Sequence, residues 1–152
     1  MPYTYEYPRP AVTVDAIVFR IIDENIEVLL IKRLHAPFEG MWAIPGGFIN
    51  LDETLEAAAA RELEEETGIK DIDLKYFGVF GDVNRDPRQR TICIAFTGLL
   101  KHNGIEANAS DDAAECQWFN INSIPEELAF DHNKIIKEAI KFAEKGNLFK
   151  IV

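Results

Sequence analysis

The segment 54–67 constrains the fold more than any other part of the chain, because it carries the signals of a complete helix. Thr54 or Asp52 is placed to cap its start, and Gly68 follows its last turn, where a left-handed C-cap is usual. At about 100° per residue, the helix stripe that holds Leu55 also holds three glutamates. The helix therefore presents acidic side chains on the face that we expect to meet the protein body.

The glutamates on that stripe are Glu62, Glu65 and Glu66, related by i, i+3 and i+4, so we expect their carboxylates to converge. Burying like charges without a partner is costly. A cation between them would remove this cost, and Mg²⁺ takes carboxylate, water and phosphate oxygens. The alternative is a solvated helix face whose glutamates pair with Arg61 and Lys70. The shared phase with the apolar stripe favours the metal site.

Strands are expected on both sides of this helix, from runs of β-branched and apolar residues. The predicted strands are Ala11–Arg20, Ile26–Lys32, Asp73–Phe80, Thr91–Leu100 and Gln117–Phe119. Turns are predicted at Asp23–Asn25 and Pro45–Gly47, and a second helix at Asn133–Lys145. This order predicts an α/β fold with a mixed sheet and a helix on each side.

Length and charge limit the possible functions. The 152 residues fit one domain, expected at 11–146, after an extended lead-in at 1–10 and before a short tail at 147–152. A net charge of −10 is unsuited to gripping nucleic acid, and no run is long and apolar enough for a membrane helix. Without a signal peptide at the start, we expect a cytoplasmic protein. Cys93 and Cys116 are expected as reduced core thiols rather than zinc ligands.

A longer pattern surrounds the glutamates. The chain has Gly47, five residues, Glu53, seven residues and then RELEEETGI from Arg61 to Ile69. This pattern resembles the Nudix box, and all nine specified positions match. The resemblance implies the α/β/α sandwich of the Nudix hydrolases. It also implies metal-dependent hydrolysis of a nucleoside diphosphate linked to another group.

The resemblance also implies roles for particular residues. Glu62, Glu65 and Glu66 are similar to the metal ligands, the Gly46 carbonyl to a further ligand, and Arg61 to the arginine that orients the glutamates. Glu53 is expected to be structural, because on the helix phase it faces away from the other three. Mg²⁺ is the expected metal, and Mn²⁺ accepts the same oxygen ligands.

The reaction also needs a general base to activate the attacking water. In similar enzymes the base is a box glutamate or a carboxylate of a later loop. The segment before the last predicted strand offers Asp111, Asp112 and Glu115. The sequence leaves these alternatives open, together with the possibility that this segment is a solvated turn.

Residues 81–88 (GDVNRDPR) are similar to a segment of ADP-ribose pyrophosphatase-like Nudix proteins and of the related sugar-nucleotide-sensing regulators, with Val83 in place of the usual proline. Arg85, Arg88 and Arg90 have the planar guanidinium that suits phosphate recognition. The alternative for each is solvation or surface pairing.

Trp42 and Phe48 flank the predicted Pro45–Gly47 turn and are candidates for stacking a base. The expected reaction is thus hydrolysis of ADP-ribose to AMP and ribose 5-phosphate. Nucleoside triphosphates, other nucleotide sugars and dinucleotides are alternative substrates.

A non-catalytic ADP-ribose-sensing module is the alternative from another class. The intact box and the short segment after Gly146, which has no room for a DNA-binding domain, favour the enzyme. A homodimer is a further hypothesis. Asp131 and His132 are expected as a helix cap and a surface histidine.

Overall fold

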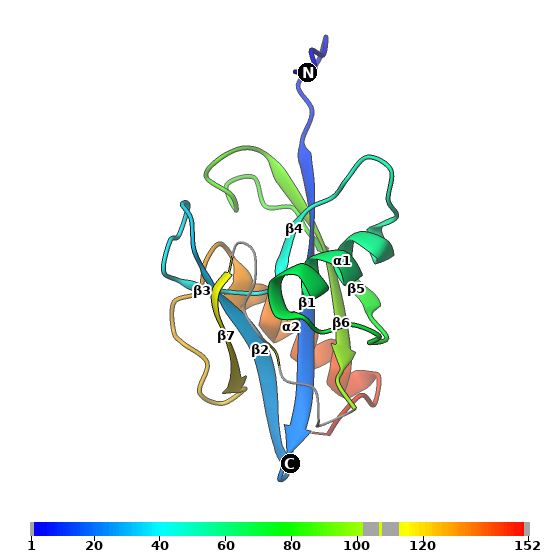
Figure 1. Cartoon of the computed structure of the whole chain (residues 1–152), viewed down its shortest axis with the longest axis vertical. Helices are drawn as coiled ribbons and strands as arrows, with labels where there is room; N and C mark the ends of the chain where they lie inside the picture. The colour runs from blue at the N-terminus through cyan, green and yellow to red at the C-terminus, as the bar shows by residue number, and fades with distance from the viewer. Residues whose placement is uncertain (1, 102–106, 108–112, 151–152) are drawn as a thin grey trace.

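The computed structural model describes residues 2–101, 107 and 113–150. The elements, in chain order, are β1 (Ala11–Ile22), β2 (Asn25–Arg33), β3 (Trp42–Ala43), β4 (Gly46–Phe48), α1 (Leu55–Thr67), β5 (Lys75–Phe80), β6 (Thr91–Leu99), β7 (Ala113–Asn120) and α2 (His132–Lys145). Figure 1 shows these elements arranged about one sheet.

The long strand β1 organises the sheet, whose main order is β3-β2-β1-β6-β5. β1 runs parallel to β6 on one side. On the other side it pairs antiparallel with β2 only from Phe19↔Val28 onward, while its first half pairs with β4, ending at Asp15↔Gly46. β7 extends the sheet from β2. Because β1 and β2 pair only at one end, they separate near the start of β1.

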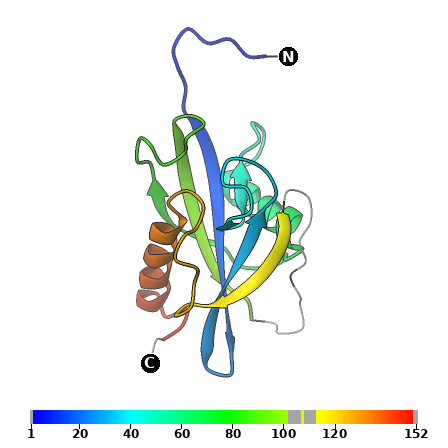
Figure 2. The same cartoon turned by 90° about the vertical axis from the view of Figure 1, so that its left-hand side faces the viewer.

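The two helices lie on opposite faces of the sheet, so the molecule has three layers (Figure 2). Alternate side chains of a strand point to opposite faces. Val14, Ala16 and Val18 of β1 accordingly pack with clusters that contain α1 residues, and Ile17 and Phe19 pack with α2. The predicted sandwich with a mixed sheet is confirmed.

The ends of α1 agree with the sequence prediction. The Thr54 hydroxyl accepts the amide of Ala57 at 3.1 Å, so Thr54 rather than Asp52 is the N-cap. Gly68 adopts φ of 77°, and its amide donates to the Glu64 carbonyl at 2.8 Å. Local signals thus suffice to place this helix.

The predicted turn at Pro45–Gly47 is wrong in part, because Gly46–Phe48 form β4 against β1. Both glycines lie against a carboxylate. A Cβ on Gly46 would lie 2.1 Å from Asp15 Oδ1, and a Cβ on Gly47 would lie 2.5 Å from Glu62 Oε1. The missing side chains permit this close approach.

Other boundaries differ by a few residues. The strand predicted from Asp73 begins at Lys75, where its pairing with β6 starts. The short strand predicted at 117–119 extends over Ala113–Asn120, because it pairs with β2 along this length.

The two ends of the chain differ in their burial. Residues 2–10 are exposed and lie outside the helices and strands (Figure 1). In the predicted tail, Phe149 is buried and its ring lies 5.0 Å from that of Phe19 in the core. Neither described helix has the length and apolar character needed to span a bilayer.

Candidate active site

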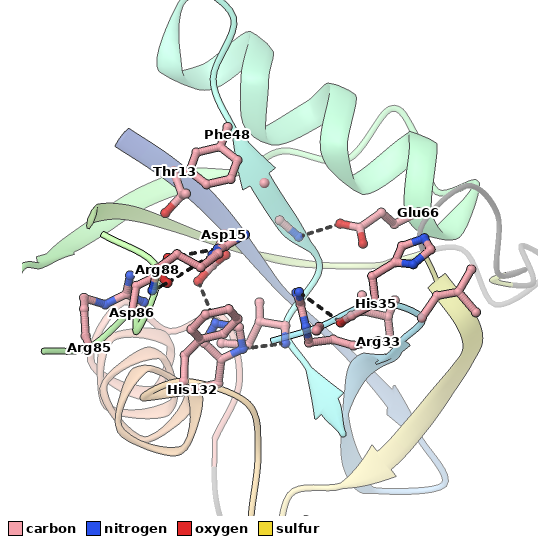
Figure 3. Close-up of a pocket in the computed structure, with 17 residues that line it drawn as sticks. Thr13, Asp15, Arg33, His35, Phe48, Glu66, Arg85, Asp86, Arg88 and His132 are labelled. Atoms are coloured by element: carbon pink, nitrogen blue, oxygen red, sulfur yellow. Dashed lines mark hydrogen bonds and ion pairs between the residues drawn. The ribbon is translucent and has the colours of Figure 1, made fainter. Parts of the chain in front are cut away.

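A cavity of about 230 Å³ lies where β1 and β2 separate. Its lining comes from six parts of the chain: Thr13 and Asp15 of β1, Arg33 and His35 at the end of β2, Gly46, Gly47 and Phe48 of β4, Glu66 of α1, Arg85, Asp86 and Arg88 between β5 and β6, and Phe130 and His132 at the start of α2. Figure 3 shows these side chains around the cavity, with Glu66 and His35 on one side and the arginines of the β5–β6 loop on the other.

Arg61 of α1 makes five hydrogen bonds within the segment that holds the Nudix box. Its guanidinium binds both carboxylate oxygens of Glu53, at 2.6 and 2.9 Å, and also reaches Glu62 at 2.9 Å and Glu65 at 3.2 Å. A further bond, of 3.2 Å, goes to the Phe48 carbonyl of β4. The expectation that Glu53 faces away is wrong, because Glu53 precedes the helix and does not follow its phase.

The Arg61 interactions shift two pKa values. The hydrogen bonds from Arg61 and from the Asn50 amide lower the pKa of Glu53 from 4.5 to about 2. The hydrogen bond with Glu53, helped by Glu62, raises the pKa of Arg61. Both groups are therefore charged throughout the neutral range, which fits a structural role for Glu53.

Glu66 is the box glutamate that lines the cavity. Glu66 is 5% exposed, and its Oε1 accepts the Gly46 amide of β4 at 2.8 Å. Cys116 donates to the Glu66 carbonyl at 3.4 Å. Burial and the charge of Glu66 raise the pKa of the Cys116 thiol to about 11, so this thiol is protonated at neutral pH.

The three glutamates offer oxygen donors of the kind that a hard divalent cation prefers. Among the described residues, no three carboxylate, imidazole or thiol groups are gathered at one metal-binding point. Instead, the Arg61 cation lies between Glu62 and Glu65, and Glu66 turns toward Gly46. The donor chemistry fits a divalent metal, and the assignment of these ligands stays a prediction.

Arg85 and Asp131 form a paired contact beside the cavity, at 2.7 and 3.0 Å. The Arg85 side chain is 4% exposed. Burial alone would lower the pKa of Arg85, but the hydrogen bonds and charge of Asp131 raise it. The structure thus places Arg85 at the cavity wall with its guanidinium held by Asp131. Asp131 precedes α2, and its side chain makes no capping hydrogen bond.

Arg88 projects over the cavity between two aromatic rings. Its guanidinium carbon lies 5.0 Å from the Phe48 ring centre and 5.5 Å from that of Phe130. Asp86 holds the same guanidinium at 2.9 and 3.0 Å. Burial opposes ionisation of Asp86, but the hydrogen bonds and charge of Arg88 lower its pKa. Arg88 and Phe48 are therefore brought together at the site.

Two other candidates lie elsewhere. Arg90 donates to the Gly81 carbonyl and does not line the cavity. Trp42 packs edge-on against Phe119, with ring centres 5.0 Å apart, on the α2 side of the sheet. The structure does not bring either residue to the site.

Sequence reasoning missed a buried pair at the cavity floor. His132 is 4% exposed, so the expectation of a surface histidine is wrong. The Ile44 amide donates to His132 Nδ1 at 2.9 Å, and His132 Nε2 lies 3.3 Å from Asp15 Oδ2. Cys93 donates to the same oxygen at 3.2 Å. Burial and the charge of Asp15 raise the pKa of the Cys93 thiol.

A signal for Asp15 was present in the sequence. Thr13 and Asp15 are polar residues two apart in a mostly apolar strand, so both point to one face. No comparable signal existed for His132, which is far from Asp15 along the chain.

The candidate bases are only partly described. Asp111 and Asp112 lie outside the described residues. Glu115 is on β7, exposed, and 3.9 Å from Lys32 Nζ. Both cysteines are free thiols, with Cys93 buried and Cys116 half-buried.

Two proteins similar in sequence to this chain are named for ADP-ribose. The ADP-ribose pyrophosphatase of Methanocaldococcus jannaschii is 44% identical over 136 residues, which are 90% of this chain and 76% of that protein. The ADPR responsive transcriptional repressor NtrR of Acinetobacter baylyi is 32% identical over 145 residues, which are 93% of this chain but only 57% of the repressor.

Two solved structures share the fold. The NUDIX domain of Shewanella oneidensis NrtR complexed with ADP ribose is 30% identical with a TM-score of 0.81, covering 90% of each chain. A bifunctional NMN adenylyltransferase/ADP ribose pyrophosphatase from Francisella tularensis, complexed with AMP and an Mn ion, is 32% identical with a TM-score of 0.75. The match covers 91% of this chain and 43% of that one. The family model for the NUDIX domain matches residues 11–139, so this chain belongs to the Nudix family.

Proposed function

We propose that this chain is a Nudix pyrophosphohydrolase that cleaves ADP-ribose to AMP and ribose 5-phosphate with the help of a divalent metal. The observation that carries the proposal is the buried Glu66 carboxylate at the cavity edge, on the same helix side as Glu62 and Glu65. The 44% identity to an ADP-ribose pyrophosphatase supports the choice of substrate.

Glu62, Glu65, Glu66 and the Gly46 carbonyl would hold the metal, Mg²⁺ or Mn²⁺. In a strand, the amide and carbonyl of one residue point to the same side. The Gly46 amide points to Glu66, so its carbonyl faces the same edge of β4. A bound divalent metal would neutralise phosphate oxygens and lower the pKa of the attacking water.

The residues of the chain supply position and charge around the diphosphate. We infer that Arg88 contacts a phosphate and that Phe48 stacks against the substrate, because both face the cavity. Arg85 is held by Asp131 and acts on the shape of the cavity wall. Arg61 keeps the glutamates in place.

The general base is a separate question, addressed by replacing the box glutamates, Asp111, Asp112 and Glu115 one at a time by the amide. The base is the residue whose loss lowers kcat most without raising KM and without changing the dependence of the rate on metal concentration.

An ADP-ribose-binding module without catalysis is the second candidate. The relationship to an ADPR responsive repressor and to an NrtR domain complexed with ADP ribose favours this reading. Three intact box glutamates favour the enzyme, because binding alone has no need of them.

Product analysis separates the two candidates. The pure protein is incubated with ADP-ribose and Mg²⁺ or Mn²⁺, beside a Glu66→Gln variant. AMP and ribose 5-phosphate from the wild type, but not from the variant, are the expected result. Tight ADP-ribose binding without turnover would support the sensing module. Cleavage only of nucleoside triphosphates, other nucleotide sugars or dinucleotides would retain the chemistry and replace the substrate.

The remaining expectations concern the setting of the enzyme. We propose that it works in the reducing cytoplasm, which suits the two free thiols, and without a nucleic-acid partner, in line with the net charge of −10. A homodimer stays a prediction, which light scattering would test.

A further inference from the structure

We propose that Asp15, with Thr13 beside it, recognises the hydroxyl groups of a ribose ring attached to the diphosphate. This inference rests on the proposed function, since it assigns a subsite within the same cavity. It identifies a specificity-determining carboxylate outside the Nudix box.

One oxygen of Asp15 is held by the protein. The Ile44 amide donates to His132 Nδ1, so the proton of the neutral ring is on Nε2, which faces Asp15 Oδ2 at 3.3 Å. Cys93 donates to the same oxygen at 3.2 Å. These contacts fix the orientation of a carboxylate that is only 6% exposed.

The other oxygen, Oδ1, has no hydrogen-bond donor among the described residues. It lies against the backbone of Gly46, where a Cβ would come within 2.1 Å, and Asp15 lines the cavity (Figure 3). Oδ1 is open to solvent in the cavity rather than enclosed, because no enclosed side-chain nitrogen or oxygen of the described residues lacks a hydrogen-bond partner. A ligand hydroxyl in the cavity would supply that donor.

The position of Asp15 favours a ribose over a base. Asp15 and Glu66 both lie at Gly46: Glu66 accepts the Gly46 amide, and Asp15 lies where a Gly46 side chain would project. If the diphosphate lies at Glu66, the group beside it is one of the two riboses, because each ribose of ADP-ribose is linked directly to a phosphate. The adenine is farther from the diphosphate. Thr13 is on the same face of β1 and adds a hydroxyl. Carboxylates recognise ribose hydroxyls in this way in dinucleotide-binding proteins.

Binding measurements test this assignment without turnover. ADP-ribose and its analogues lacking a 2- or 3-hydroxyl on one ribose or the other are titrated by calorimetry in the presence of a chelator. We expect the wild type to bind one of these deoxy analogues about tenfold to a hundredfold more weakly than ADP-ribose. The affected ribose, adenosine or terminal, identifies which one occupies the subsite.

The Asp15→Asn variant completes a double-mutant cycle. Asparagine has the size of aspartate and still accepts the His132 proton, but it binds hydroxyls without a charge. We expect Asp15→Asn to weaken ADP-ribose binding by about the same factor as removal of the hydroxyl does in the wild type. The affinity for the deoxy analogue should be little lower in the variant than in the wild type. Asp82→Asn, at an exposed carboxylate outside the cavity, is the matched control.

Equal weakening of all analogues by Asp15→Asn, or unchanged ADP-ribose binding, would overturn the inference. Loss of binding on replacing the adenine amine, with no effect of the hydroxyls, would do the same. If Asp15→Asn does not fold, Thr13→Val and the discrimination by the wild type still decide. Failure of the proposed function is a different result, namely no AMP from ADP-ribose with metal while hydroxyl discrimination persists.

Discussion

Arg61 connects more of the box than any other single side chain described here. Its guanidinium joins Glu53, which precedes α1, to Glu62 and Glu65 within α1 and to the Phe48 carbonyl of β4. In this arrangement Arg61 is the cation that separates two of the predicted metal ligands. Glu53 and the carbonyl hold Arg61 at the opposite end, so Glu53 acts on the ligands through Arg61.

Glu53→Gln is therefore expected to weaken metal use even though Glu53 is not a proposed ligand. Loss of a residue that orients ligands typically costs about tenfold to a hundredfold in metal affinity or activity. The measurement is the rate of ADP-ribose cleavage as a function of Mg²⁺ concentration. Glu64→Gln, at an exposed position of the same helix, is the control. An unchanged metal dependence in Glu53→Gln would contradict the positioning role.

The ion pair of Glu53 and Arg61 stabilises the fold over a defined pH range. The pKa of Glu53 is about 2 in the folded chain, below its ordinary 4.5. Its stabilising contribution is thus fully present above about pH 4.5 and is lost as the pH falls toward 2. The interaction is constant across the neutral range in which activity is measured.

The buried Cys93 thiol is expected to give the stability of the fold the opposite pH dependence. Its pKa is raised well above 9.0 by burial and by Asp15, so the folded state keeps a proton that the unfolded state loses. Stability is retained below pH 9.0 and falls as the pH rises above it, by up to about 1.4 kcal/mol per pH unit for one group. Urea unfolding of wild type and Cys93→Ala from pH 7 to 10.5 should show a steeper loss in the wild type. Parallel curves would contradict the prediction.

At the element scale, α1 begins at a cap whose contribution is separable from the site. Thr54 is exposed and its hydroxyl accepts the Ala57 amide. Thr54→Ala should lower the free energy of unfolding by about 1 kcal/mol, whereas Thr54→Ser should retain most of the stability. Chemical denaturation measures both. We expect the activity of the two variants at saturating metal to match the wild type, and a large activity loss would place Thr54 in the site.

The sequence predicted α1 well because its signals are local. The cap, the C-terminal Gly68 and the apolar stripe all lie within one segment. β4 was not predictable in the same way, because Gly46–Phe48 is a strand only through its pairing with β1. For the same reason the location of Trp42, on the α2 side of the sheet, was not visible in its spacing from Phe48.

At the scale of the whole molecule, Arg85 and Asp131 link the β5–β6 loop to the start of α2 beside the cavity. Removing one partner of a buried pair leaves the other charge unsatisfied and costs about 3 kcal/mol. Arg85→Met should therefore destabilise the fold by about this amount, and adding Asp131→Leu should restore much of the loss. Urea denaturation of both single variants and the double variant gives the coupling. Strictly additive losses would show that the pair contributes little.

The sequence predicted the site residues within the Nudix box, and outside the box it predicted Arg88, which lines the cavity. Glu62, Glu65, Glu66 and Arg61 are close together in the chain, and the helix alone brings them near one another. His132 and Asp15 meet because α2 starts beside the strand β1, which depends on the complete sheet. The pairing of Arg85 with Asp131 likewise depends on the complete fold, and the predicted phosphate contact of Arg85, which lines the cavity, stays a prediction.

The close contacts of Gly46 and Gly47 with carboxylates limit where the length of this chain can vary. Gly46 faces Asp15 and Gly47 faces Glu62, so one backbone step separates the proposed ribose contact from a proposed metal ligand. An insertion or deletion of one residue in β4 would exchange the two faces and set a side chain against one of these carboxylates. Length changes should therefore be rejected between Ala43 and Phe48.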